Sequence, residues 1–252
     1  MRRRRPRVLR ETGRARPALD AGGPRPRRQD GGARARGLPA PLRRRIRGGA
    51  AGRARRTAGS APPRPPGHRR PGAAAAEYVR SSGGIFRDCH IHDFDILRWV
   101  TGREVDSVTA VGANRGDAYF SAAGDVDTSA AVLALDDGTL ATLQGSRYNG
   151  AGYDVRMELS GTAATWVVGL DERAPLRSAE PGVDWPPGGP WTDFQERFEP
   201  AYANEIGTFL EMARGRVDSP CTVDDALQAL LVAEAATLSL REGRSVPLAE
   251  IR

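Results

Sequence analysis

The chain has 252 residues, a formal net charge of +7 and two cysteines, Cys89 and Cys221. Two cysteines make no disulfide framework, and no apolar run approaches the roughly 18 residues of a membrane span. We therefore expect a cytoplasmic protein with two reduced thiols and no membrane association, built as one large domain or two ordinary ones.

The excess of positive over negative charge lies in the first part of the chain. Residues 1–76 contain 23 Arg and 3 acidic residues, whereas residues 77–252 contain 15 Arg and 28 acidic residues. Apolar residues are sparse in the basic segment, so it cannot bury enough surface to offset the entropy of ordering, and we expect it to be disordered. Its Arg would attract nucleic-acid phosphate, but interleaved aromatic residues are lacking, which makes nucleic-acid binding the weaker interpretation.

Residues 77–252 are expected to fold as a separate domain, and they begin with a helix. The stretch 81–102 predicts this helix, with Ser81 or Ser82 as its N-terminal cap and Gly102 as its stop. Whether residues 1–76 are frame-shifted or misassigned sequence is left open.

Strands follow the helix. Residues 104–114 are β-branched and roughly alternating, and 128–147 predict a hairpin with its turn at Asp136-Asp137-Gly138. Two more strands are expected at 153–161 and 162–169, and the Pro- and Gly-rich residues 174–191 predict a long loop.

Two amphipathic helices are expected at 194–215 and 222–243, each closed by Gly. Asp224 and Asp225 lie in the first turn of the second helix and Arg241 in its last, as the helix dipole favours. The order of elements predicts an α+β fold: a mainly antiparallel open sheet with helices on one face.

The segment GGIFRDCHIHDFDILRW, residues 83–99, concentrates ionisable side chains. His90 and His92 on a strand would supply two metal ligands, but a site needs more, and the remaining histidine, His68, lies in the basic segment. We expect no metal site.

On a helix, Asp88, His92 and Asp95 have the spacing i, i+4, i+7 and share one face. A carboxylate one turn from an imidazole forms an acid/base pair. His90 and Asp93 would then face solvent or cap the helix. Spacing alone leaves open a second interpretation, a helix whose polar face is merely hydrated.

The whole segment GGIFRDCHIHDFDILRWVTG resembles the catalytic helix of the glucose–fructose oxidoreductase/inositol 2-dehydrogenase (Gfo/Idh/MocA) family, whose pattern is Gly-Gly, a few residues, Asp, three residues, His. The resemblance covers about residues 77–252, the C-terminal domain of that family, and is closest to the inositol 2-dehydrogenase branch. It continues in order through AGDVDTSAAVLALDDGTLATLQGSR, GYDVRMELSG, RFEPAYANEIGTFLEMARG and DALQALLVAEAATLSLREGRSVPL.

The resemblance implies oxidation of a polyol or sugar hydroxyl with NAD or NADP. His92 would take the hydroxyl proton, and Asp88 would orient the substrate and the imidazole. Tyr153, Tyr202 and Arg147 would face the substrate, although ordinary packing or an ion pair explains each of these three equally well.

The resemblance also implies what this chain lacks. The family begins with a Rossmann domain and uses a lysine from an EKP sequence, whereas this chain has no strand–Gly-x-Gly-x-x-Gly–helix unit and no lysine. We expect the Rossmann domain and cofactor-binding residues to be absent, and the chain alone to be inactive. A homo-oligomer through the sheet face is expected, and a non-catalytic oligomerisation module is the alternative function.

Overall fold

The computed structural model describes residues 50–55, by their backbone alone, and residues 74–251. The expectations for the other residues of the basic segment lie outside this part. The chain divides into two units, Met1–Asp30 and Gly31–Arg252, and all described residues belong to the second. None of the helices described is long and apolar enough to cross a membrane.

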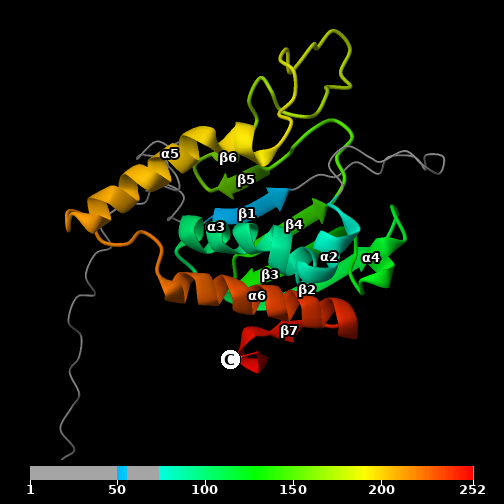
Figure 1. Ribbon diagram of the computed structural model, residues 1–252, viewed down its shortest axis with the longest axis vertical. Coiled ribbons are helices and arrows are strands. Elements are labelled where there is room, and N and C mark those ends of the chain that lie inside the picture. Colours follow the sequence, from blue (N-terminus) through cyan, green and yellow to red (C-terminus); the bar gives the residue numbers. More distant parts are fainter. Residues whose placement is uncertain (1–49, 56–73, 252) are drawn as a thin grey trace, which may run out of the picture. The chain divides into compact units, whose positions relative to one another are not determined.

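The helical elements are α2 (Ala76–Ser81), η2 (Phe86–His90), α3 (Ile91–Thr101), α4 (Tyr119–Ala122), α5 (Phe194–Ala213), α6 (Val223–Glu242) and η3 (Leu248–Glu250). The strands are β1 (Ala50–Arg55), β2 (Val105–Ala113), β3 (Thr128–Leu135), β4 (Leu140–Ser146), β5 (Arg156–Gly161), β6 (Thr165–Val168) and β7 (Val246–Pro247). These strands form one sheet in the order β6-β5-β1-β4-β3-β2-β7 (Figure 1).

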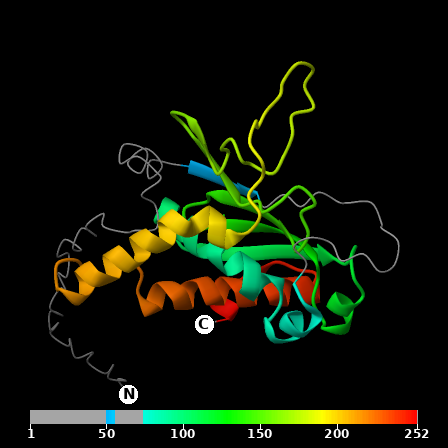
Figure 2. The same ribbon diagram turned by 45° about the horizontal axis from the view of Figure 1, so that its top comes forward.

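All strand pairs are antiparallel except β1 with β4, which run parallel. Helices α3 and α6 lie on the same face of the sheet (Figures 1 and 2). Their apolar side chains meet those of the strands in one core, in which Phe94, Leu97, Val108, Leu133 and Leu143 are almost fully buried. The predicted α+β fold, a mainly antiparallel open sheet with helices on one face, is confirmed.

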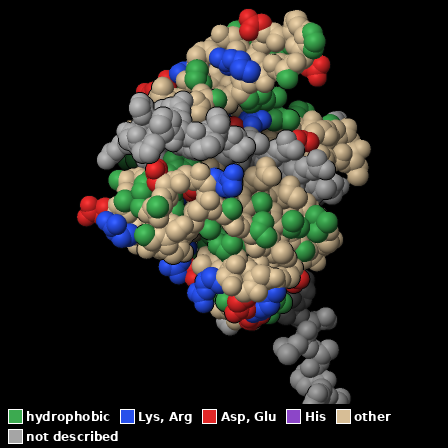
Figure 3. All heavy atoms as spheres, turned by 90° about the vertical axis from the view of Figure 1, so that its right-hand side faces the viewer, with side chains coloured by type: hydrophobic (Ala, Val, Ile, Leu, Met, Phe, Trp, Pro, Cys, Tyr) green, Lys and Arg blue, Asp and Glu red, His purple; other side chains and the backbone are tan. Residues whose placement is uncertain are grey.

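Among the described elements, neither α3 nor α6 covers the opposite face of the sheet. Buried and exposed residues alternate along β3 and β4, as expected for strands covered on one side only. Val111, Val132 and Leu140 are exposed apolar residues of β2, β3 and β4. Figure 3 shows one side of the molecule, on which hydrophobic side chains reach the surface among charged ones.

Strand β1 lies within the segment predicted to be disordered, so that prediction is wrong for Ala50–Arg55. Its backbone pairs with β5 on one side and β4 on the other. The partner residues lie 89 positions away in β4 and 101 to 111 positions away in β5, and such distant main-chain pairing leaves no signal in local composition.

Several predicted boundaries are confirmed. Gly102 and Gly243 end α3 and α6 in the left-handed conformation, each with φ of 66°. Gly138 turns the β3–β4 hairpin with φ of 84°. At the start of α6 the side chain of Thr222 accepts from the Asp225 amide, and the Asp225 carboxylate accepts from the Thr222 amide.

The start of the second helical run differs from the prediction. Ser81 ends the separate helix α2, and Gly83 and Gly84 follow with φ of 80° and 91°. The helix resumes at Ile85, whose amide donates to Asp125 Oδ1 at 3.0 Å. Capping is thus provided by a carboxylate forty residues away rather than by a nearby serine.

Candidate active site

The residues singled out by the sequence surround an unusual turn of helix. Residues Phe86–His90 form a π-helical turn that continues directly into α3. A π-turn holds more residues than an α-turn, and such turns occur frequently at functional sites. The i, i+4 spacing of Asp88 and His92 spans the junction between this π-turn and α3.

Asp88 and His92 differ in exposure and in their hydrogen-bond partners. The Asp88 side chain is 16 % exposed and bonded to neighbours. His92 is exposed on α3. Within residues 74–251 no hydrogen bond or ion pair joins them, so the expected acid/base pair is not in direct contact.

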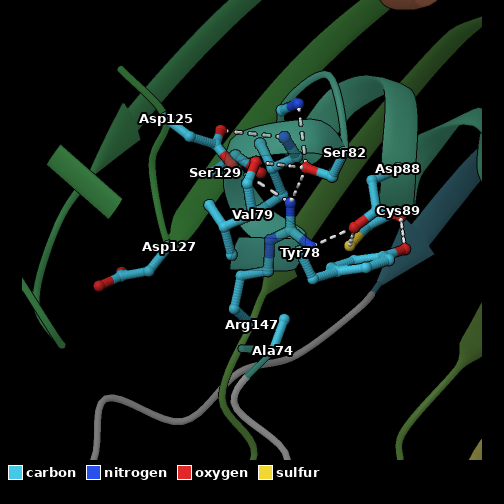
Figure 4. A network of polar contacts seen from close by, with 12 residues as sticks. Ala74, Tyr78, Val79, Ser82, Asp88, Cys89, Asp125, Asp127, Ser129 and Arg147 are labelled. Carbon is cyan, nitrogen blue, oxygen red and sulfur yellow. Dashed lines mark hydrogen bonds and ion pairs between the residues drawn. The ribbon is translucent and has the colours of Figure 1, made fainter. Parts of the chain in front are cut away.

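Both carboxylate oxygens of Asp88 accept hydrogen bonds (Figure 4). The Tyr78 hydroxyl donates to Oδ1 at 2.5 Å, and the Arg147 guanidinium donates to Oδ2. The hydrogen bond to Asp88, followed by desolvation, raises the pKa of Tyr78 above its ordinary value. The Asp88 carboxylate thus accepts from two donors, one of them cationic.

Arg147, at the end of β4, is buried between two carboxylates. Its second terminal nitrogen donates to Asp125 Oδ2 at 3.2 Å and to Ser82 Oγ at 3.3 Å. Since Asp125 also accepts from the Ile85 amide, the guanidinium is tied to the start of the helical run that carries Asp88. The negative charges of Asp88 and Asp125 offset the cost of burying the Arg147 cation.

His90 and Asp93 are buried, so the expectation that they face solvent or cap the helix is wrong. His90 Nδ1 lies 2.9 Å from Asp93 Oδ2, and Nε2 lies 2.8 Å from Ser129 Oγ. A Cβ on Gly145 would lie 2.3 Å from His90 Cε1, so the glycine makes room for the ring. Of the two histidines, His90 lies in the core and His92 is exposed.

The two predicted substrate-facing tyrosines lie at α5. The Tyr153 ring is 6.5 Å from that of Phe194 and 6.1 Å from that of Phe198. Tyr202 is 43 % exposed on the same helix. Arg147 is the one member of this predicted set that the structure places against Asp88.

Tyr78 and Asp125 were not singled out by the sequence. Neither belongs to the pattern around residue 90, and each reaches the site through tertiary structure: Tyr78 from α2 and Asp125 from the loop before β3. The absence of a shared spacing left no signal that would have found them. Within residues 50–55 and 74–251, no group of three or more His, Cys, Asp or Glu side chains is arranged to hold a metal.

Two curated relatives match this domain. Myo-inositol 2-dehydrogenase of Thermotoga maritima is 36% identical over 192 residues, which cover 73% of this chain and 54% of the relative. The scyllo-inositol 2-dehydrogenase (NAD(+)) of Bacillus subtilis is 36% identical over 180 residues, covering 70% and 51%. The chain thus spans about half the length of these relatives.

A solved structure and a family model also match this chain. The structure of scyllo-inositol dehydrogenase from Lactobacillus casei with bound cofactor NAD(H) and scyllo-inositol matches with a TM-score of 0.64 at 26% identity, covering 82% of this chain and 62% of that one. The model of the GFO/IDH/MocA C-terminal domain matches residues 40–167. This range includes β1 and the site residues Tyr78, Asp88 and Arg147. The chain belongs to the GFO/IDH/MocA family.

Proposed function

We propose that this chain supplies the polyol-binding and proton-transfer half of an inositol dehydrogenase. The observation that carries the proposal is the Asp88 carboxylate, which accepts from Arg147 and Tyr78 and lies on the helical run that also exposes His92. The names of the matched relatives, which are inositol dehydrogenases, supply the substrate class.

Oxidation of an alcohol removes a proton from oxygen and a hydride from carbon. Imidazole is the side chain best suited to accept a proton near neutral pH, and His92 is exposed at the surface. The His92 imidazole takes the hydroxyl proton, while the Asp88 carboxylate orients the substrate and stabilises the imidazolium.

The hydride acceptor of the relatives is a nicotinamide nucleotide, NAD or NADP for this chain. A dinucleotide site needs a Gly-rich turn from a parallel strand into a helix. Strands β1 and β4 are the one parallel pair among the described strands. The element after β4 is the strand β5 rather than a helix, and the sequence after β1 contains no Gly-x-Gly-x-x-Gly. The described residues therefore do not fit the nucleotide.

Calorimetric titration of the chain with myo-inositol tests the substrate half. We expect binding by the wild-type chain and a loss of at least about tenfold in affinity for Asp88→Asn, which keeps the shape but removes the charge. Arg103→Gln, a change at an exposed ion pair, is the control. An affinity that Asp88→Asn leaves unchanged would exclude this role for Asp88.

A second titration, with NAD and with NADP, tests the assignment of the cofactor. We expect no tight binding of either nucleotide by this chain. A micromolar dissociation constant would overturn that expectation and would call for a nucleotide site outside residues 50–55 and 74–251.

The open face of the sheet favours a second candidate function, a homo-oligomerisation module. Exposed Val111, Val132 and Leu140 are apolar, and contiguous apolar surface marks interaction sites. Sedimentation of the wild-type chain and of Val132→Asp tests this candidate. A defined oligomer that dissociates in the variant is expected, whereas a wild-type monomer would exclude it.

A further inference from the structure

The Asp88 carboxylate has a buried side and a solvent side. Oδ2 accepts from Arg147, whose side chain is only 4 % exposed. Oδ1 accepts from Tyr78, which is 51 % exposed. A molecule approaching Asp88 from solvent therefore meets the side occupied by the Tyr78 hydroxyl.

The buried side is fixed in position. Arg147 also bonds Asp125 and Ser82, and Asp125 holds the amide that begins the helix. Displacing Arg147 would leave two carboxylates without their cation, which is strongly unfavourable. A ligand of Asp88 is thus restricted to Oδ1.

The Tyr78 hydroxyl is suited to a ligand with neighbouring hydroxyl groups. Its single hydrogen is donated to Asp88, and its two oxygen lone pairs remain to accept hydrogen bonds. The raised pKa of Tyr78, caused first by its bond to Asp88, keeps the hydroxyl protonated over the neutral range. Two acceptors, Asp88 Oδ1 and the Tyr78 oxygen, thus lie side by side, 2.5 Å apart (Figure 4).

We propose that Tyr78 is a further substrate-binding residue of this chain, which accepts a hydrogen bond from the hydroxyl next to the one bound by Asp88. The inference rests on the proposed function and adds selectivity for vicinal diols. A monohydric alcohol uses Asp88 alone, whereas a polyol with adjacent hydroxyls uses Asp88 and Tyr78 together.

The test compares two ligands and two variants of the full chain. Affinities for cis-1,2-cyclohexanediol and for cyclohexanol are measured by ligand-observed NMR on the wild type, Tyr78→Phe and Tyr119→Phe. Tyr119 bonds a backbone carbonyl, that of Ala74, and serves as the matched control. We expect Tyr78→Phe to weaken the diol about tenfold and to leave cyclohexanol unchanged, because one hydrogen bond of a polar pair is lost.

A spectroscopic readout follows Tyr78 in the wild-type chain itself. In wild-type chain labelled at tyrosine Cζ, the Tyr78 signal is assigned by its absence in Tyr78→Phe, and myo-inositol is then added. We expect the Tyr78 signal to move and the Tyr119 signal to remain. A stationary Tyr78 signal with myo-inositol bound, or equal losses for diol and cyclohexanol, would overturn the proposal and leave the proposed function standing. Failure of wild type to bind myo-inositol would overturn both.

Discussion

The Nε2 atom of His90 lies 2.8 Å from Oγ of Ser129, and this contact ties the π-helical turn to strand β3. The same imidazole bonds Asp93 through Nδ1. The buried ring thereby fixes the rotation of the helical run about its axis. It follows that the outward positions of Asp88 and His92 depend on a residue that cannot itself touch a substrate.

Ser129→Ala removes the partner of a fully buried ring nitrogen. We expect the free energy of unfolding to fall by about 1–3 kcal/mol, the cost of leaving a buried polar atom unsatisfied. Urea denaturation followed by circular dichroism measures the change. Ser178→Ala, at a half-buried serine that accepts from the Glu180 amide, is the control and should change little. Equal effects at the two sites would contradict the anchoring role of Ser129.

Gly145→Ala places a methyl group on the His90 ring. The Cβ would lie 2.3 Å from Cε1, and overpacking of this kind typically costs about 1–3 kcal/mol. Gly150→Ala adds the same methyl where no atom lies within 4 Å and should be nearly neutral. In the double variant His90→Ala/Gly145→Ala, the cost of the methyl should shrink, because the clashing ring is gone. Strictly additive effects would exclude the contact.

Arg147→Met leaves Asp88 and Asp125 without their cation. Breaking a buried ion pair from one side costs about 3–5 kcal/mol, and we expect a loss in this range in thermal and urea unfolding. Arg147→Lys should lose less, since it keeps the charge but cannot bridge both carboxylates.

The matched control for Arg147 is Arg103→Met. Arg103 is 50 % exposed in its side chain and pairs with Asp137 at 3.0 Å. Exposed pairs of this kind contribute at most about 1 kcal/mol. Comparable losses at Arg103 and Arg147 would show that burial of the Arg147 network has no energetic consequence.

Glu196 predicts a pH dependence at the start of α5. Hydrogen bonds from Thr192, and then from Arg173, lower its pKa from 4.5 to about 2. A folded-state pKa below the unfolded value means that the contribution is present above the unfolded pKa. It is lost as the pH falls from about 4.5 through about 2.

Acid unfolding of the wild type and of Glu196→Gln tests this dependence. We expect the stability of the variant to fall less steeply across the same pH window, because its amide does not titrate. The exposed Glu199→Gln is the control and should follow the wild-type curve. A variant curve parallel to the wild-type curve would contradict the prediction.

Local chemistry explains which parts of the fold were predictable. The stops at Gly102 and Gly243 and the turn at Gly138 each need a left-handed backbone, which glycine adopts without a steric penalty. The hairpin and the two long helices follow from hydrophobic periodicity in the same way. These features depend on residues that are neighbours in the sequence.

The π-turn was not predictable on that basis. An i, i+4 reading of Asp88 and His92 assumes an uninterrupted α-helix, whereas the turn is accompanied by burial of His90 against Ser129 and by capping from Asp125. Both partners come from the segment around β3, about forty residues later. The resemblance of the pattern to a family identified Asp88, but its neighbours Tyr78 and Asp125 required the folded chain.

Strand β1 joins the two parts of the sheet. Since β1 lies between β5 and β4, it is the only described link in hydrogen bonding between the β5–β6 hairpin and the other strands. Proteolytic removal of residues 50–55 would open a seam through the middle of the sheet and expose two unpaired strand edges. The β5–β6 hairpin would then be attached to the rest of the domain only by its covalent connections and by side-chain packing. The unpaired strand edges would be a site for aggregation.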